Sequence, residues 1–263
     1  MSYAAMQKPK TTRLGAVRYL NAKPLTYALA QTAPWAEVIF DFPSRLADRL
    51  AAGDLDVALI PSVEYLRHPS YRIVSDACIA CQGQVHSIKL YGRVPAEKIR
   101  TLALDEGSRT SAVLAQILLR EQYRVRPEIQ PLPLGADISE VAADAVLLIG
   151  DRGMATVNGK YEFIWDLGAR WTSWAGLPFV FALWIARPDI ELQGIAEALA
   201  AARDEGLRRV EEIARQESPK LAISEAECVI YLRDHLHFYF GSREQAGLQR
   251  FSDLAEQHGL IHS

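Results

Sequence analysis

Short apolar runs alternate with helical patterns through the first half of the chain, and this alternation restricts the fold more than any other feature. Apolar runs at residues 13–17, 37–42 and 55–61 are typical of strands. Helical patterns begin near Ala22 and cover residues 43–54. This order predicts an α/β fold with a parallel sheet and right-handed crossovers.

Two segments of the chain are built alike. LDVALIPSVEYL (55–66) and ADAVLLIGDRGM (143–154) each have an acidic lead-in, an apolar run and a turn followed by a polar residue. Two such units predict two similar lobes, which the chain connects twice, through 85–93 and 178–187. We expect lobe I to comprise residues 1–88 and 183–263, with a helical C-terminal region, and lobe II residues 89–182. The cleft between the lobes, at the carboxyl ends of the strands, is the expected ligand site.

Composition narrows the classes of partner. The 263 residues carry a net charge of −3 with no basic cluster, so the chain lacks the electrostatic footprint of a nucleic-acid-binding protein. No apolar run approaches the ~20 residues of a membrane span, and the N-terminus lacks a secretory pattern. We therefore expect a cytoplasmic protein that binds a small molecule. The sequence carries no signal for oligomeric state.

Three cysteines are present, and two of them, Cys78 and Cys81, form a C-x-x-C pair. The pair lies in an extended apolar stretch, and neither a second pair nor a nearby His completes a metal set. Buried structural thiols are the favoured interpretation. The familiar nucleotide-loop, nucleophile and metal motifs are also missing, so the sequence predicts neither a metal nor a cofactor.

The segment DEGSRTSAVL (105–114) places three hydroxyls, Ser108, Thr110 and Ser111, and Arg109 where a strand gives way to a helix. A helix N-terminus offers unpaired N–H groups and a partial positive charge, so hydroxyls there suit a carboxylate or phosphate. Ordinary capping requires only one such residue. Anion binding is the interpretation we favour.

Further candidate residues follow the other apolar runs. Gly150 would let a ligand approach the backbone and Asp151 could accept a hydrogen bond, although a simple turn with a capping Asp explains both equally well. Ser62, at the turn in IPS, has the same standing, and Gly176, in the tight turn before the apolar strand of WAGLPFVFALW, is predicted to help form the hydrophobic side of the cleft.

Two short segments complete the candidate set. QVHSIKL (84–90), taken as a strand, puts Ser87 on one face and His86 on the other. No partner by spacing supports His86 as a base, so a structural role is favoured. In YLNAKPL (19–25), Asn21 suits a helix N-cap and would also point into the cleft. Tyr19 lies on the same side and is a weaker candidate for the cleft wall.

Several of these segments together resemble one family. GAVRYLNAKPL, ALIPSVEYL, VHSIKL, LALDEGSRTS, LLIGD and WAGLPFVFALW are similar, in this order, to chorismate dehydratases of the futalosine route to menaquinone. The resemblance runs from about Leu14 to Ile185. The sister enzyme that makes 1,4-dihydroxy-6-naphthoate shares the fold but carries a different stretch in place of VRYLNAKPL, so it ranks second. A non-catalytic carboxylate-binding protein is the third alternative.

The resemblance implies a type II periplasmic-binding-protein fold and a hydro-lyase with chorismate as its substrate. The reaction would be a substrate-assisted elimination of water, giving 3-[(1-carboxyvinyl)oxy]benzoate, with orientation and electrostatics supplied by the protein. By position, the family's active-site Asn matches Asn21 and its active-site Ser matches Ser87. Ala175 replaces a Thr that many relatives carry, so one possible hydroxyl contact is missing.

Overall fold

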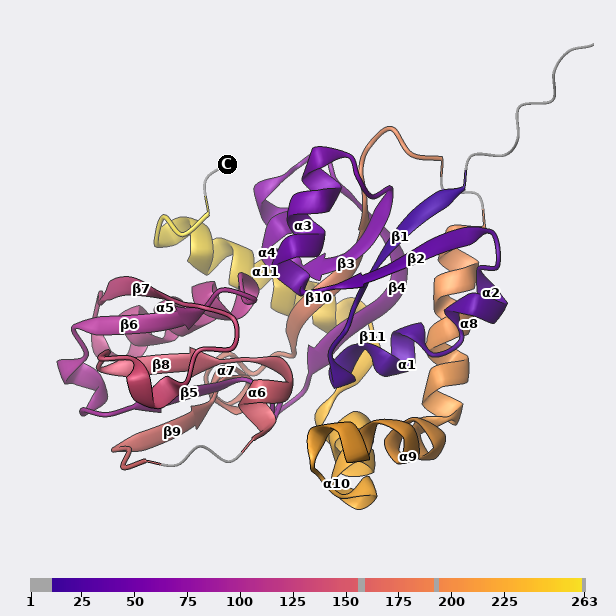
Figure 1. Cartoon of the computed structure of the whole chain (residues 1–263). Coiled ribbons are helices and arrows are strands. Elements are labelled where there is room, and N and C mark those ends of the chain that lie inside the picture. The colour runs from indigo at the N-terminus through magenta and orange to yellow at the C-terminus, as the bar shows by residue number, and fades with distance from the viewer. Residues whose placement is uncertain (1–10, 156–158, 192–193, 262–263) are drawn as a thin grey trace, which may run out of the picture.

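The computed structural model describes residues 11–155, 159–191 and 194–261, which form two mixed α/β lobes lying side by side (Figure 1). The first sheet has six strands in the order β11-β4-β10-β3-β1-β2. The second has five strands in the order β7-β6-β8-β5-β9. The α/β class predicted from the alternating pattern is confirmed.

The first sheet begins with the predicted parallel unit. Strand β1 pairs in parallel with β2 and β3, whereas β10 runs antiparallel to β3 and β4, and β11 antiparallel to β4. The strands are β1 (Thr12–Val17), β2 (Ala36–Asp41), β3 (Val57–Pro61), β4 (Arg72–Cys81), β10 (Phe179–Ala186) and β11 (His237–Tyr239).

The second sheet repeats this plan on a smaller scale. Strand β6 is parallel to β7 and β8, and β5 is antiparallel to β8 and β9. The strands are β5 (Lys89–Gly92), β6 (Thr101–Asp105), β7 (Glu128–Leu132), β8 (Ala145–Leu148) and β9 (Phe163–Asp166).

Helices cover the faces of both sheets. In the first half they are η1 (Leu20–Ala22), α1 (Lys23–Thr26), α2 (Leu29–Thr32), α3 (Pro43–Ala52), α4 (Ser62–Arg67), η2 (Ala96–Lys98), α5 (Thr110–Tyr123) and η3 (Ile138–Glu140). In the second half they are α6 (Gly150–Met154), α7 (Leu167–Ala175), α8 (Ile195–Arg208), α9 (Val210–Leu221), α10 (Glu225–Ile230), a π-helical turn η4 (Tyr231–His235) and α11 (Ser242–Gln257). No helix in the described ranges has the length and apolar character needed to span a membrane.

Three details differ from the sequence-based expectation. The whole of β10 pairs with β4, from Phe179 opposite Cys81 to Ala186 opposite Arg72, so the chain returns to lobe I before residue 179 and not at 183. Residues 85–88 form a loop, because His86 adopts a left-handed φ of 66° and strand β5 begins only at Lys89. The segment 224–240 is helical only to His235, after which β11 pairs with the edge of β4.

Candidate functional site

The carboxyl ends of strands from both sheets meet at one small cavity. Val17 and Pro61 end β1 and β3 in lobe I, and residues 107–111 and 149–150 follow β6 and β8 in lobe II. The cavity encloses about 50 Å³. Its lining consists of Val17, Tyr19, Asn21, Pro43, Pro61, Ile79, Ile88, Gly107, Ser108, Arg109, Thr110, Ser111, Ile149, Gly150, Phe181 and Ala182.

Asn21 contributes the amide group of the lobe I wall. It lies inside η1, and the N-cap positions of η1 and α1 belong to Tyr19 and Ala22, so the predicted capping role is wrong. Its side-chain Oδ1 is buried and has no hydrogen-bond partner among the described residues. Because an unpaired buried oxygen costs free energy, its position in the cavity lining points to a ligand group as the missing partner.

The N-terminus of α5 forms the opposite wall. Arg109 occupies the N-cap position, and no side chain caps the helix. The hydroxyls of Ser108 and Ser111 line the cavity and make no hydrogen bond within the described part of the chain. The first N–H groups of this 14-residue helix and two free hydroxyls are thus available to one anionic group.

Thr110 and Ser62 are instead committed to contacts between protein groups. The Oγ1 of Thr110 accepts a hydrogen bond from the backbone N–H of Val63 at 3.2 Å, across the cleft. Ser62 is fully buried and donates to the carbonyl of Val180 at 2.7 Å. Both residues join segments around the cavity, and only Thr110 is part of its lining.

Tyr19 fills the space between Asn21 and lobe II. Its ring lies against Gly150, where a Cβ atom would come within 2.9 Å of the ring, and Gly150 also has a φ of 57°. Burial raises the pKa of the Tyr19 phenol, and the nearby carboxylate of Asp105 adds to the rise. The phenol is therefore a hydrogen-bond donor throughout the physiological pH range.

Asp151 lies outside the cavity lining and links the lobes. Its carboxylate accepts a hydrogen bond from the backbone N–H of Leu20 at 3.0 Å, at the start of η1. Burial raises the pKa of Asp151, and the bond from Leu20 opposes that rise. The carboxylate thus holds the segment that carries Asn21 against lobe II.

Gly176 also lies outside the cavity lining. It is exposed and ends α7 as its C-cap with a φ of 69°, a conformation that glycine adopts without strain. Ala175, at the position where many relatives have Thr, is the last residue of α7 and does not line the cavity either.

Ser87 lies in the segment that connects the two sheets. It is fully buried, and its Oγ accepts a hydrogen bond from the hydroxyl of Tyr231 at 2.8 Å. The neighbouring Ile88, and not Ser87, is part of the cavity lining. His86 stacks on His235 with ring centroids 5.4 Å apart, in agreement with a structural role.

Tyr231 is the residue that the sequence did not single out. It begins the π-helical turn η4, and 144 positions separate it from Ser87. Because Tyr231 donates to Ser87, the hydroxyl hydrogen of Ser87 stays free for another acceptor. π-Helical turns often mark functional sites, but they are not visible as a sequence pattern.

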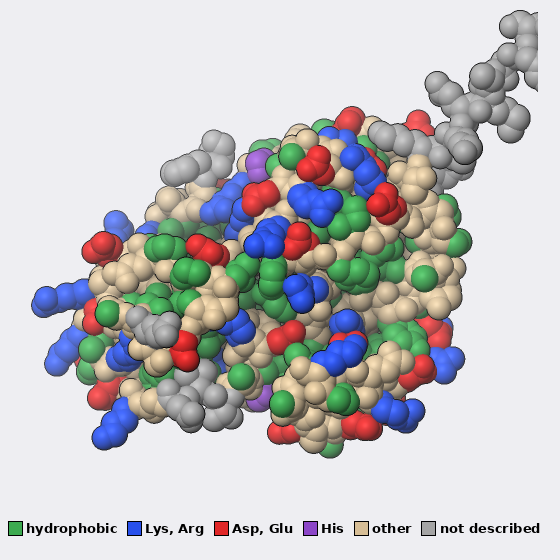
Figure 2. All heavy atoms as spheres, in the orientation of Figure 1, with side chains coloured by type: hydrophobic (Ala, Val, Ile, Leu, Met, Phe, Trp, Pro, Cys, Tyr) green, Lys and Arg blue, Asp and Glu red, His purple; other side chains and the backbone are tan. Residues whose placement is uncertain are grey.

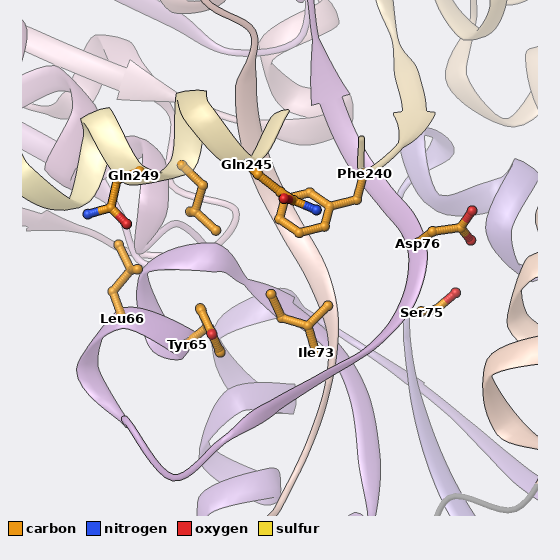
Figure 3. Close-up of a pocket in the computed structure, with 9 residues that line it drawn as sticks. Tyr65, Leu66, Ile73, Ser75, Asp76, Phe240, Gln245 and Gln249 are labelled. Atoms are coloured by element: carbon orange, nitrogen blue, oxygen red, sulfur yellow. The ribbon is translucent and has the colours of Figure 1, made fainter. Parts of the chain in front are cut away.

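A second hollow, of about 510 Å³, lies between α4, β4 and α11 (Figure 3). Tyr65 and Leu66 of α4, Ile73 of β4, and Gln245 and Gln249 of α11 contribute to its walls. This hollow is larger than the cleft cavity but lacks unpaired buried polar atoms. Within the described ranges, no group of three or more His, Cys, Asp or Glu could hold a metal ion.

Comparison with known proteins agrees with this geometry. A family model described as "Menaquinone biosynthesis" matches residues 12–257. The chain belongs to this menaquinone biosynthesis family. A curated relative, chorismate dehydratase of Thermus thermophilus, is 29% identical over 259 residues, covering 91% of this chain and 93% of the relative.

Solved structures of low sequence identity share the fold. A protein of Archaeoglobus fulgidus superposes with a TM-score of 0.77 at 18% identity, covering 95% of this chain and 98% of that one. The periplasmic aliphatic sulphonate binding protein of Escherichia coli superposes with a TM-score of 0.64 at 14% identity, covering 97% of this chain and 89% of that one. The predicted type II periplasmic-binding-protein fold is therefore confirmed.

Proposed function

We propose that this member of the menaquinone biosynthesis family is a chorismate dehydratase, which eliminates water from chorismate to give 3-[(1-carboxyvinyl)oxy]benzoate. The observation that carries the proposal is the pairing of two unsatisfied groups on one cavity. Asn21 has a buried Oδ1 that no other described residue pairs with, and the uncapped N-terminus of α5 lies on the opposite wall. The resemblance to the Thermus thermophilus enzyme over nearly the whole chain supports the same assignment.

Chorismate offers a complementary group to each wall. Its ring carboxylate suits the α5 N-terminus, where the helix dipole and the hydroxyls of Ser108 and Ser111 stabilise negative charge. Its ring hydroxyl donates a hydrogen bond to Asn21 Oδ1. Tyr19, a neutral phenol beside Gly150, closes one side of the site and keeps water away from the ring.

The elimination needs little acid–base chemistry from the protein. The enolpyruvyl carboxylate of the substrate takes the ring proton, the electron pair of that C–H bond forms the new ring double bond, and the C–O bond breaks. The proton that the enolpyruvyl carboxylate has taken passes to the hydroxyl, which leaves as water, and the ring becomes aromatic. The protein acts by holding the substrate in the reactive conformation and by stabilising the charge that develops in the transition state. Ser87, with its free hydroxyl hydrogen, orients a substrate carboxylate once the cleft has admitted it.

The observed cavity is a closed state of this cleft. Sites for small molecules ordinarily enclose ~300–1,000 Å³, whereas this cavity holds about 50 Å³. Substrate entry therefore requires the lobes to move apart around the connections at residues 82–88 and 176–178, as in hinge closure around other ligands.

The experiment is incubation of the purified protein with chorismate, followed by ultraviolet absorbance and product mass. A substituted benzoate one water lighter than chorismate supports the proposal. Binding of chorismate without turnover would identify a carboxylate-binding protein. Chorismate that is neither bound nor consumed would refute the proposal and leave the sister reaction, which starts from a different substrate, as the alternative to test.

A further inference from the structure

Arg109 reaches across the cleft from lobe II to two carboxylates of lobe I. Its Nη2 lies 2.6 Å from the Oδ1 of Asp48 on α3, and its Nη1 lies 3.3 Å from the Oε2 of Glu64 on α4. The guanidinium carries the only positive side-chain charge in the lining of the cavity. Both terminal nitrogens of the guanidinium pair with carboxylates of the protein. Arg109, which the sequence suggests as a ligand for a substrate anion, therefore faces lobe I.

We infer that Arg109 is a positioning residue that latches the lobes closed and so sets the α5 N-terminus against Asn21. The role of this latch in catalysis rests on the proposed function. The existence of the latch rests on the ion-pair geometry alone. Arg109 is the N-cap residue of α5, so any movement of lobe II that separates it from Asp48 and Glu64 also withdraws Ser108 and Ser111 from the cavity.

Neighbouring bonds across the cleft fit the same closed arrangement. Thr110 accepts from the backbone N–H of Val63, next to Glu64 in sequence, and Asp151 accepts from Leu20 on the other side of the cavity. The ion pairs of Arg109 are therefore part of a set that forms only when the strand ends of both lobes meet.

The composition of the latch makes it reversible. Glu64 is buried but also pairs with Arg67, at 2.9 Å on its own helix, so it keeps a cationic partner when the lobes separate. Asp48 is largely exposed, with 66% of its side chain accessible, and returns to water. Opening thus leaves no buried carboxylate unpaired, whereas closing gains a bridging cation with two anionic contacts.

The latch itself is tested without substrate. Small-angle X-ray scattering of the ligand-free protein compares wild type with Arg109→Gln, with the milder Asp48→Asn, and with Arg208→Gln as a matched control. Among the described residues, Arg208 pairs only with Glu205 on its own helix, and it is not part of the cavity lining. We expect the radius of gyration, ~18 Å for a compact chain of this length, to rise by roughly 1 Å in Arg109→Gln and less in Asp48→Asn. It stays at the wild-type value in the control.

The kinetic test uses the same variants with chorismate. Arg109→Gln should raise KM for chorismate about tenfold and lower kcat by a smaller factor. The reason is that the lobes close after the substrate has bound, and Asn21 is present in both the open and the closed arrangement. Asp48→Asn should raise KM in the wild-type background but add nothing to Arg109→Gln, since the two residues act as one pair.

Three results would overturn the latch: an unchanged radius of gyration in Arg109→Gln, additive effects of the two substitutions on KM, or an equal effect of Arg208→Gln. Failure of the wild type to act on chorismate would instead refute the proposed function. The scattering comparison would still decide the latch in that case, and Asp48→Asn, at an exposed position, guards against misfolding of the Arg109 variant.

Discussion

At the scale of single residues, the cost of an unpaired group is the clearest sign of function. Asn21 keeps a buried oxygen that has no partner in the described part of the chain, which stability alone does not explain. Replacement of Asn21 by Ala removes that unpaired oxygen, so the variant should be as stable as wild type or more stable, by ~1 kcal/mol or ~2–4 °C in Tm. Thermal unfolding of wild type and Asn21→Ala measures this difference in Tm. A loss of several degrees would mean that Asn21 has a structural partner.

We expect Tyr231 to act through Ser87, to which its hydroxyl donates a hydrogen bond. Tyr231→Phe removes the hydroxyl that fixes the Ser87 side chain, and we expect kcat/KM for chorismate to fall about tenfold, which is ~1.4 kcal/mol. The matched control is Tyr239→Phe, at an exposed position in β11. In a Ser87→Ala background, Tyr231→Phe should have no further effect on kcat/KM. A further tenfold loss there would show that Tyr231 acts independently of Ser87.

Site residues can be predicted from the sequence where the pattern that identifies them lies in neighbouring positions of the chain. Asn21 and the hydroxyls of residues 108–111 were predicted because each lies at a strand end beside a helix start, and both line the cavity. The bond between Tyr231 and Ser87 spans 144 positions and depends on a π-helical turn, so no spacing rule reveals it. Gly176 was predicted from the same turn logic, yet that turn ends α7 at the surface.

At the scale of elements, no side chain caps the N-terminus of α5, and we propose that this helix end is kept open for an anion. Ser108→Asp places a carboxylate beside it, which should stabilise the helix by ~0.3–1 kcal/mol but compete with a substrate carboxylate. We expect Tm to stay level or rise while KM for chorismate increases about tenfold or more. Ser108→Ala controls for loss of the hydroxyl. Unchanged KM in Ser108→Asp would place the substrate carboxylate elsewhere.

The elements themselves were largely predictable from periodicity, with instructive exceptions. The parallel start of the first sheet follows from the alternation of apolar runs and helices. The sequence pattern predicts helix where β11 lies, because HFY gains its strand character only by pairing with the edge of β4. The sequence pattern predicts strand at residues 85–88, which form a loop, because the left-handed φ of His86 is set by tertiary contacts, including the hydrogen bond from its backbone N–H to Asp166.

At the scale of the whole molecule, the duplicated strand–helix unit predicted two lobes and a cleft, but not how closely the lobes approach. The closed arrangement depends on cross-cleft contacts such as Arg109 with Asp48 and Asp151 with Leu20, which join residues far apart in sequence. Charged side chains of both signs are mixed over the surface drawn in Figure 2, in keeping with the net charge of −3.

The interior of the molecule should protect its thiols. All three cysteines are free and buried, and burial raises the pKa of Cys81 to about 12 and that of Cys228 to about 11. At pH 8 the thiolate fraction of Cys81 is therefore roughly 10³-fold below that of an unfolded chain. We expect alkylation of the native protein to be correspondingly slow and to accelerate only as urea unfolds it. Rapid labelling of the folded protein would contradict the buried placement.

Our central proposal is that the cleft carries out the elimination with Asn21 in contact with the substrate. The direct measurement is the rate at which product one water lighter than chorismate appears, with wild type and Asn21→Ala at equal concentrations of folded protein. We predict many turnovers per molecule for wild type and a rate ~10²-fold lower for Asn21→Ala, the loss typical of one oriented polar contact at a reacting centre. Chorismate left unchanged by the wild type, or equal rates in both proteins, would contradict the account.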